Sequence, residues 1–123
     1  MILGIGVDLC SIDRLRKAII NEHFVKKIFS DEEIDYAYAQ GEPARHFASA
    51  YAAKEALAKA TGMGMFGLGL HSSSVRRTED GPVIICSKSL REKFEGRGIK
   101  NCLLSLTHEG DYALAFVVLE SER

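Results

Sequence analysis

The stretch "SAYAAKEALAKATG", residues Ser49–Gly62, decides the fold that we expect for this chain of 123 residues. Its alanines and its leucine favour a helix, and the small alanines allow that helix to pack closely against other elements. Pro43 stands where a first-turn proline belongs, and Gly62 is the usual residue after a helix end. We therefore predict one long helix from Pro43 to Thr61, with the core built around it.

Glu55 is the unusual residue of this helix, because its carboxylate is expected to be partly buried. It follows Tyr51 by four residues and Phe47 by eight, so the three side chains share one broad face. An unpaired buried charge costs roughly several kcal/mol and therefore needs a partner. Lys59, four residues further on, is the simplest partner, although such a pair contributes only ~0.2–0.5 kcal/mol. A bound cation is the alternative.

The rest of the chain carries strand and helix signals without an internal repeat or a linker between domains. Ser30 and Glu33 form a capping-box pattern, and "HEGD" is typical of a tight hairpin turn. We predict a single domain over residues 1–123, of the α+β class, with a mostly antiparallel sheet packed on the one long helix. The expected strands are Ile2–Leu9, Ser73–Thr78, Val83–Cys86, Cys102–Thr107 and Asp111–Glu120; the other expected helices are Ile12–Phe29, Ser30–Gln40 and Ser87–Glu95, and Gly62–Gly69 is expected to be a loop.

The composition excludes several classes of protein. With 46% hydrophobic and 27% charged residues, the chain is typical of a globular protein rather than a disordered one. Its longest apolar run, Ala113–Leu119, is far shorter than the ~20 residues of a membrane span, and Asp8 comes too early for an export signal. A net charge of −1 argues against bulk electrostatic binding of nucleic acid. We therefore predict neither a membrane nor a nucleic-acid partner.

The cysteines indicate the compartment. Cys10, Cys86 and Cys102 are odd in number and form no CxxC pair. Thiols with this spacing are typical of small buried side chains in a reducing environment. We therefore predict a cytoplasmic protein without structural zinc.

Asp8 closes the first apolar strand, two residues after the second glycine of a Gly-x-Gly motif. Mg²⁺ takes one or two protein carboxylates and completes its shell with water and phosphate oxygens, so Asp8 and Glu55 would be sufficient for a magnesium site. The alternative is that Asp8 is a capping or turn carboxylate before Ser11. A dinucleotide-binding fingerprint is excluded, because it requires a third glycine where Leu9 stands.

Two further segments could contact a phosphate group. The segment "GMGMFGLG", Gly62–Gly69, would let backbone N–H groups approach an anion, with Lys54 and Lys59 supplying charge, although a flexible connector is the simpler interpretation. The segment "SLTHEGDYALAF" brings Ser105 and His108 to a strand end, where a lone histidine is more often structural than catalytic. Neither a GxSxG motif nor a Cys/His arrangement supports a covalent nucleophile.

The predicted helix after Ser11 is locally basic in a chain that is net negative. Such a cluster is usually a solvated face, but it also suits the docking of an acidic partner, because complementary fields speed encounter. The local charge of +3 comes from Arg14, Arg16, Lys17, Lys26 and Lys27 against Asp13 and Glu22.

Three segments carry a resemblance to a known family. They are "GIGVDL" at residues 4–9, "FASAYAAKEALAKATGMG" at residues 47–64 and "SLTHEGDYALAFVVLE" at residues 105–120. Each is weak alone, but in this order and at these separations they resemble the holo-[acyl-carrier-protein] synthases, the small phosphopantetheinyl transferases. The similarity runs nearly from end to end of the chain.

This resemblance implies transfer of 4′-phosphopantetheine from coenzyme A to a serine of an apo-acyl carrier protein, releasing adenosine 3′,5′-bisphosphate, as a step that serves fatty acid biosynthesis and lipid metabolism. It implies Mg²⁺ held by Asp8 and Glu55, an acidic acyl carrier protein docked on the first helix through Arg14, Lys17 and Phe24, and a homotrimer with clefts between subunits. The residues expected to line the coenzyme A cleft are Arg45, Lys54, Lys59, Gly62, Gly64, Ser105 and His108.

The acceptor serine must also lose a proton, and the sequence leaves three candidate bases open. These are Glu55 acting through a metal-bound water, Asp35 and His108. One position departs from the family pattern: many relatives have arginine where Ala50 stands, so that phosphate contact is either missing or supplied by Arg45.

Two other functions fit the same residues. A Mg²⁺-dependent phosphohydrolase acting on a nucleotide could use the same carboxylate pair, and a noncatalytic module could bind an acidic protein through the first helix. The basic helix favours the transferase over the hydrolase. The carboxylate pair and the glycine-rich segment favour it over the noncatalytic module.

Overall fold

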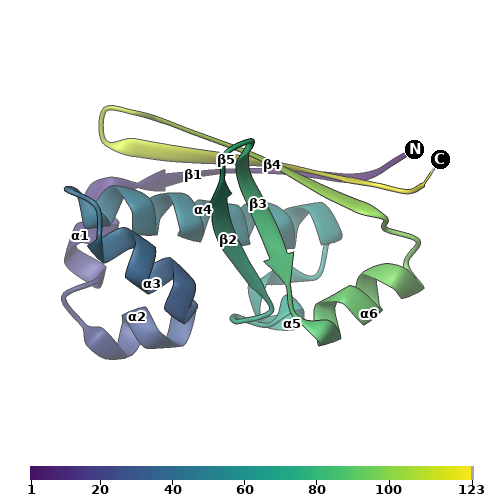
Figure 1. Ribbon diagram of the computed structural model, residues 1–123, viewed down its shortest axis with the longest axis horizontal. Coiled ribbons are helices and arrows are strands. Elements are labelled where there is room, and N and C mark those ends of the chain that lie inside the picture. Colours follow the sequence, from purple (N-terminus) through teal and green to yellow (C-terminus); the bar gives the residue numbers. More distant parts are fainter. Residues whose placement is uncertain (123) are drawn as a thin grey trace.

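The computed structural model describes residues 1–122 and confirms the predicted α+β class. Met1 lies beside the segment that follows β5 (Figure 1), where the Ser121 N–H donates to the Met1 carbonyl at 2.8 Å. The elements are β1 (Ile2–Ser11), α1 (Ile12–Ala18), α2 (Glu22–Ile28), α3 (Asp31–Tyr38), α4 (Pro43–Thr61), α5 (Gly64–Leu68), β2 (Ser73–Thr78), β3 (Gly81–Cys86), α6 (Lys88–Gly96), β4 (Asn101–Glu109) and β5 (Tyr112–Glu120).

The strands form two antiparallel sheets rather than one. The larger sheet has the order β1-β5-β4, and β2 and β3 form a separate hairpin. Helix α4 runs along one face of the larger sheet, the β2–β3 hairpin crosses it, α1 to α3 gather at one end, and α5 and α6 lie towards the other (Figure 1). The predicted helix Pro43–Thr61 is confirmed, and it ends on Gly62 with a φ of 75°. This central helix therefore contacts most of the other elements.

Strand β1 passes against the backbone of α4 because two of its residues are glycines. A Cβ on Gly6 would lie 1.8 Å from the carbonyl oxygen of Ala56, and a Cβ on Gly4 would lie 2.1 Å from that of Ala60. No side chain fits at such distances, so only glycine allows this approach. Asp8, two residues after Gly6 on β1, is thereby held beside the same helix. The Gly-x-Gly motif thus serves helix–strand packing.

A buried polar cluster ties α3, α4 and β2 together. The predicted capping box is confirmed: the Ser30 hydroxyl accepts from the Glu33 N–H, and the Glu33 carboxylate accepts from the Ser30 N–H at 2.9 Å. The other Glu33 oxygen accepts from the Val75 N–H at 2.9 Å. Lys54 of α4 lies 3.1 Å from the first oxygen and also donates to the Ser73 carbonyl. One carboxylate therefore has partners on three elements.

Two predicted elements were wrong. The single helix expected over Ile12–Phe29 is broken into α1 and α2, because the Asn21 side chain accepts from the N–H groups of His23 and Phe24 and starts a new helix. The expected loop Gly62–Gly69 contains the short helix α5. Its glycines disfavour a helix, but Leu68 is buried and anchors the turn in the core.

The face of the larger sheet that points away from α4 is apolar and exposed. Ile5 and Val7 on β1, Phe116 on β5 and Leu103 on β4 all lie on it, and the register places Val7 directly opposite Phe116. An apolar surface that spans three strands is typical of a contact between protein chains. Among residues 1–122, no helix has both the length and the apolar character needed to cross a bilayer.

Candidate active site

The fold brings Asp8 of β1 near enough to Glu55 of α4 for their charges to interact. Burial and the negative charge of Asp8 raise the pKa of Glu55, whereas Lys59 and Arg14 lower it. The Asp8 side chain is only 16% exposed, and Glu55 is partly buried. Neither carboxylate is turned out to bulk solvent, so the two acids predicted to share a cation lie in one shielded place.

Lys59 pairs with Asp8 rather than with Glu55, the partner that helical spacing suggested. Its Nζ lies 3.2 Å from Asp8 Oδ1 and donates to the carbonyl oxygen of Val7 at 3.1 Å. The ammonium is mostly exposed, with 56% of the side chain open to solvent. It therefore lies at the mouth of the carboxylate pair.

Arg14 supplies the second positive charge at this site. Its guanidinium lies 5.5 Å from the ring centroid of Tyr51, within cation–π distance, and donates to Cys10 Sγ at 3.7 Å. Burial and the charge of Glu55 raise the pKa of Tyr51. Arg14, predicted as a docking residue, thus also lies beside the carboxylate pair.

The donor set fits a hard divalent cation. Asp8 is not the cap of α1, since the Ser11 side chain fills that role by accepting from the Arg14 N–H at 3.1 Å, and the capping alternative for Asp8 is excluded. Residues 1–122 contain no cluster of three or more His, Cys, Asp or Glu side chains that could hold a metal. Two carboxylate oxygens match a Mg²⁺ that takes its other ligands from water and substrate, and they do not match zinc.

A second cluster is entirely basic. Arg45, His46, Arg77 and His108 line a pocket of about 190 Å³ between α4, β2 and β4. The Nε of Arg45 is buried without a hydrogen-bond partner among residues 1–122, although another guanidinium nitrogen lies 3.4 Å from His46 Nε2. Burial, followed by the charges of Arg45, Arg77 and His108, lowers the pKa of His46. Such a pocket is suited to an anion that would satisfy the unpaired donor.

The structure separates the other predicted site residues. Lys54 is a correction: its side chain is 3% exposed and paired with Glu33, so it cannot line a surface cleft. Ser105 lies opposite Phe116 on the exposed face of the larger sheet, and Gly62 and Gly64 lie at the far end of α4. His108 belongs to β4 and joins Arg45 in the basic pocket.

The remaining candidates lie on the helices before α4. Asp35 is exposed on α3, and its charge is not among those that shift the pKa of Glu55. Lys17 is exposed on α1 and pairs with Asp13 at 3.3 Å. Phe24 on α2 packs edge-on against the ring of Phe29.

Sequence reasoning missed His46 and Arg77. Arg77 lies on β2 with its guanidinium 4.9 Å from the Tyr36 ring centroid, and beside Ala50 it lines a small adjoining pocket with His46. Neither residue belongs to a motif, and the approach of β2 to α4 is a tertiary contact. Only the unpaired basic character of "VRR" and "ARH" could have pointed to them.

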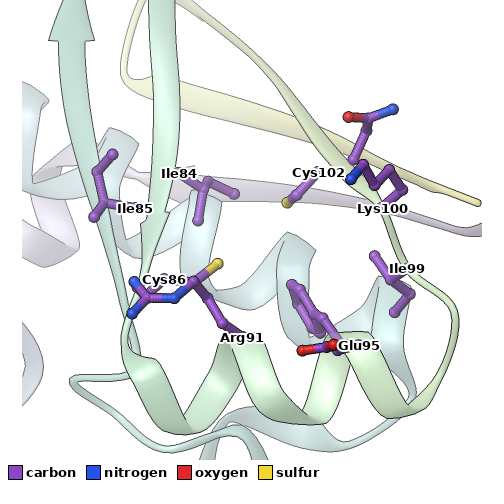
Figure 2. A pocket seen from close by; sticks show the side chains of 10 residues that line it. Ile84, Ile85, Cys86, Arg91, Glu95, Ile99, Lys100 and Cys102 are labelled. Carbon is purple, nitrogen blue, oxygen red and sulfur yellow. The ribbon is translucent and has the colours of Figure 1, made fainter. Parts of the chain in front are cut away.

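A larger hollow does not mark the site. It measures about 700 Å³ and lies between β3, α6 and the start of β4 (Figure 2). The sulfur atoms of Cys86 and Cys102 point into it (Figure 2). Burial and, to a lesser extent, Cys86 raise the pKa of Cys102 to about 12, so this thiol stays protonated. Within residues 1–122, the side chains that line this hollow include none of the predicted site residues.

Comparison with known proteins gives matches along nearly the whole chain. Residues 4–117 match the model of the 4′-phosphopantetheinyl transferase superfamily. The chain is 36% identical over 122 residues to a holo-[acyl-carrier-protein] synthase of Clostridium acetobutylicum, covering 98% of both chains, and 40% identical over 124 residues to one of Syntrophus aciditrophicus, covering 98% of this chain and 97% of the relative.

Solved structures give the same result. The crystal structure of the holo-[acyl-carrier-protein] synthase from Neisseria meningitidis matches with a TM-score of 0.90 and 34% identity, covering 98% of this chain and all of that one. The enzyme from Bacillus anthracis, solved in complex with CoA (3′,5′-ADP), matches with a TM-score of 0.81 and 30% identity over 99% of both chains. The chain therefore belongs to the 4′-phosphopantetheinyl transferase superfamily, in its family of holo-[acyl-carrier-protein] synthases.

Proposed function

We propose that this enzyme transfers 4′-phosphopantetheine from coenzyme A to a serine of an apo-acyl carrier protein, with Mg²⁺ as cofactor and adenosine 3′,5′-bisphosphate as the other product. The observation that carries the proposal is the Asp8–Glu55 pair with Lys59 at its mouth. The reaction is a displacement at a pyrophosphate phosphorus, which depends on positioning and on neutralising negative charge.

Asp8 and Glu55 would hold the Mg²⁺, whose chemistry is to neutralise and orient the pyrophosphate oxygens. Lys59 adds a flexible positive charge beside the same carboxylates. Among the three candidate bases, Glu55 lies within this site, whereas Asp35 is exposed on α3 and His108 lines the basic pocket. Because it lies in this site and because burial and the charge of Asp8 raise its pKa, Glu55 is our choice of acceptor for the serine proton.

The basic pocket gives a place for a second phosphate. Coenzyme A carries a pyrophosphate and, separately, a 3′-phosphate on its ribose. A pocket with two guanidinium groups and no carboxylate suits the phosphate that needs no metal, so we assign Arg45, His46, Arg77 and His108 to the 3′-phosphate. The B. anthracis relative, solved in complex with CoA (3′,5′-ADP), supports coenzyme A as the substrate class.

We also propose that the acidic carrier docks on α1 and α2. We further propose that three copies assemble through the exposed apolar face of β1, β5 and β4. A reducing cytoplasm suits the three free thiols. Light scattering on the purified protein would test the assembly, and a monomer at working concentrations would contradict it.

One assay tests the proposed reaction directly. The protein is mixed with coenzyme A, MgCl₂ and a folded apo-acyl carrier protein, and the carrier is weighed by mass spectrometry. We expect the carrier to gain one phosphopantetheinyl group, and we expect Glu55→Gln to lower the rate about 1,000-fold while the thermal midpoint changes little. A carrier whose mass stays unchanged with metal present would refute the transferase. Loss of folding in Glu55→Gln would point instead to a structural role for this carboxylate.

A further inference from the structure

We propose that Lys59 is the resident counter-ion of Asp8: a divalent cation displaces its ammonium from the carboxylate, and the released ammonium then serves a substrate phosphate. This inference rests on the proposed function and deepens it. In this proposal Lys59 competes with the metal and also contributes to turnover. Removing the residue should therefore tighten metal binding but lower kcat.

The first argument is the position of Lys59. Its Nζ contacts Asp8 Oδ1 at 3.2 Å and the Val7 carbonyl at 3.1 Å, so it already occupies one lone-pair direction of a proposed metal ligand. The lysine side chain is 56% exposed, whereas that of Asp8 is 16% exposed. An ion pair with one partner in solvent is weak and is screened by salt, and a divalent cation can displace it.

The second argument is the contrast with Arg14. That guanidinium is restrained by the Tyr51 ring at 5.5 Å and by Cys10 Sγ at 3.7 Å, and it makes its contacts without an ion pair to either carboxylate. Lys59 carries a compact ammonium on a flexible four-carbon stem, and neither of its contacts is enclosed. Of the two cations beside the site, Lys59 is thus the one that pairs with an oxygen of a proposed metal ligand and would compete with a cation for it.

The third argument is charge balance. The two carboxylates bring −2, and Lys59 with Arg14 bring +2, so the site has no net negative charge with which to attract a divalent ion. Moving Lys59 away restores part of that charge and places the ammonium where anionic oxygens of the substrate would neutralise it. The exchange therefore couples metal binding to phosphate binding.

The test is titration of Mn²⁺ alone into the full chain by isothermal calorimetry, for the wild type, Lys59→Met, Asp8→Asn and Lys27→Met. We expect Lys59→Met to lower the dissociation constant for the metal about fivefold, because a unit charge next to the ligand is removed. Raising the salt concentration should reduce this difference. Lys27→Met makes the same change of net charge at an exposed position on α2 and should leave the dissociation constant unchanged. In the carrier assay, Lys59→Met should lower kcat despite its tighter metal binding.

Each outcome is decisive. Unchanged or weaker metal binding in Lys59→Met, with binding lost in Asp8→Asn, would refute the counter-ion role and leave the metal site intact. An equal gain in metal affinity in Lys27→Met would show a general effect of net charge and would also refute the counter-ion role of Lys59. Absence of metal binding in all four proteins would show that a divalent cation alone does not displace Lys59 from Asp8, and this would refute the inference.

Discussion

Helix α4 carries two lysine–carboxylate pairs of almost the same length in opposite surroundings. Lys54 lies 3.1 Å from Glu33, and the two side chains are 3% and 2% exposed. Lys59 lies 3.2 Å from Asp8, and the corresponding values are 56% and 16%. Distance alone would treat these pairs as equal.

Their surroundings give the two pairs different functions. The Glu33 carboxylate is buried and has partners on three elements, so this pair fixes the packing of α3, α4 and β2. The Lys59 ammonium is open on one side, and Asp8 has the repelling charge of Glu55 nearby. A buried pair with several partners holds the fold, and a largely exposed pair can exchange partners.

The comparison predicts its largest effect at the buried pair. Lys54→Met should lower the free energy of unfolding by about 3–5 kcal/mol, because it leaves the Glu33 carboxylate buried without its cation. Urea denaturation measures this change. The double variant Glu33→Gln/Lys54→Met should recover part of the loss, since it removes the uncompensated charge. A loss below about 1 kcal/mol for the single variant would mean that this pair is not the fixed point we describe.

The basic pocket extends the comparison to Arg77, a cation for which no ion pair with a carboxylate is found among residues 1–122. Arg77→Ala should raise the KM for coenzyme A about tenfold and reduce the preference for coenzyme A over dephospho-coenzyme A, because it removes one guanidinium of the pocket proposed to bind the 3′-phosphate. Arg76→Ala is the matched control on the same strand, since Arg76 pairs with Glu32 on the surface at 2.8 Å. Steady-state kinetics with both substrates measure the effect. Equal losses in the two variants would refute the assignment.

The fold was largely predictable from the sequence because its signals are local. Pro43, Gly62 and the capping box at Ser30 and Glu33 fixed helix ends that the structure confirms. The break at Asn21 was missed, because its side-chain capping competes with a helical pattern that continues on either side.

The site was predictable only in part. Helical spacing placed Glu55 on a packed face, and it also implied that Lys54, one residue earlier, points about 100° away from it. The helical spacing therefore indicated already that the side chains of Lys54 and Glu55 lie in different surroundings. His46 and Arg77 had only the basic character of their segments to indicate them, because they become neighbours only when β2 packs against α4.

Removal of the exposed lysine should have almost no effect on stability. Lys59→Met is expected to change the free energy of unfolding by no more than about 0.5 kcal/mol, since a largely exposed pair contributes little. The measurement is the same urea denaturation as for Lys54→Met, so the two lysines of α4 are compared directly. A loss above about 2 kcal/mol would show that the Asp8 contact is structural, and the distinction between the two pairs would fail.

The smallest effect concerns the sign of a pH dependence. Burial and Asp8 raise the pKa of Glu55 above its ordinary value of 4.5, so the folded state disfavours the ionised carboxylate. The folded protein therefore binds more protons than the unfolded chain between 4.5 and the raised pKa, and this group makes stability fall as pH rises through that window. In the absence of metal, Glu55→Gln should be slightly more stable than the wild type at pH 7, and the gain should disappear below pH 4.5, where both states of the wild type are protonated. Urea denaturation of both proteins across this range measures the difference. A Glu55→Gln variant that is less stable at pH 7 would mean that attraction to Lys59 and Arg14 outweighs burial and the repulsion by Asp8, so that the carboxylate pair would be held together by its cations even without a metal.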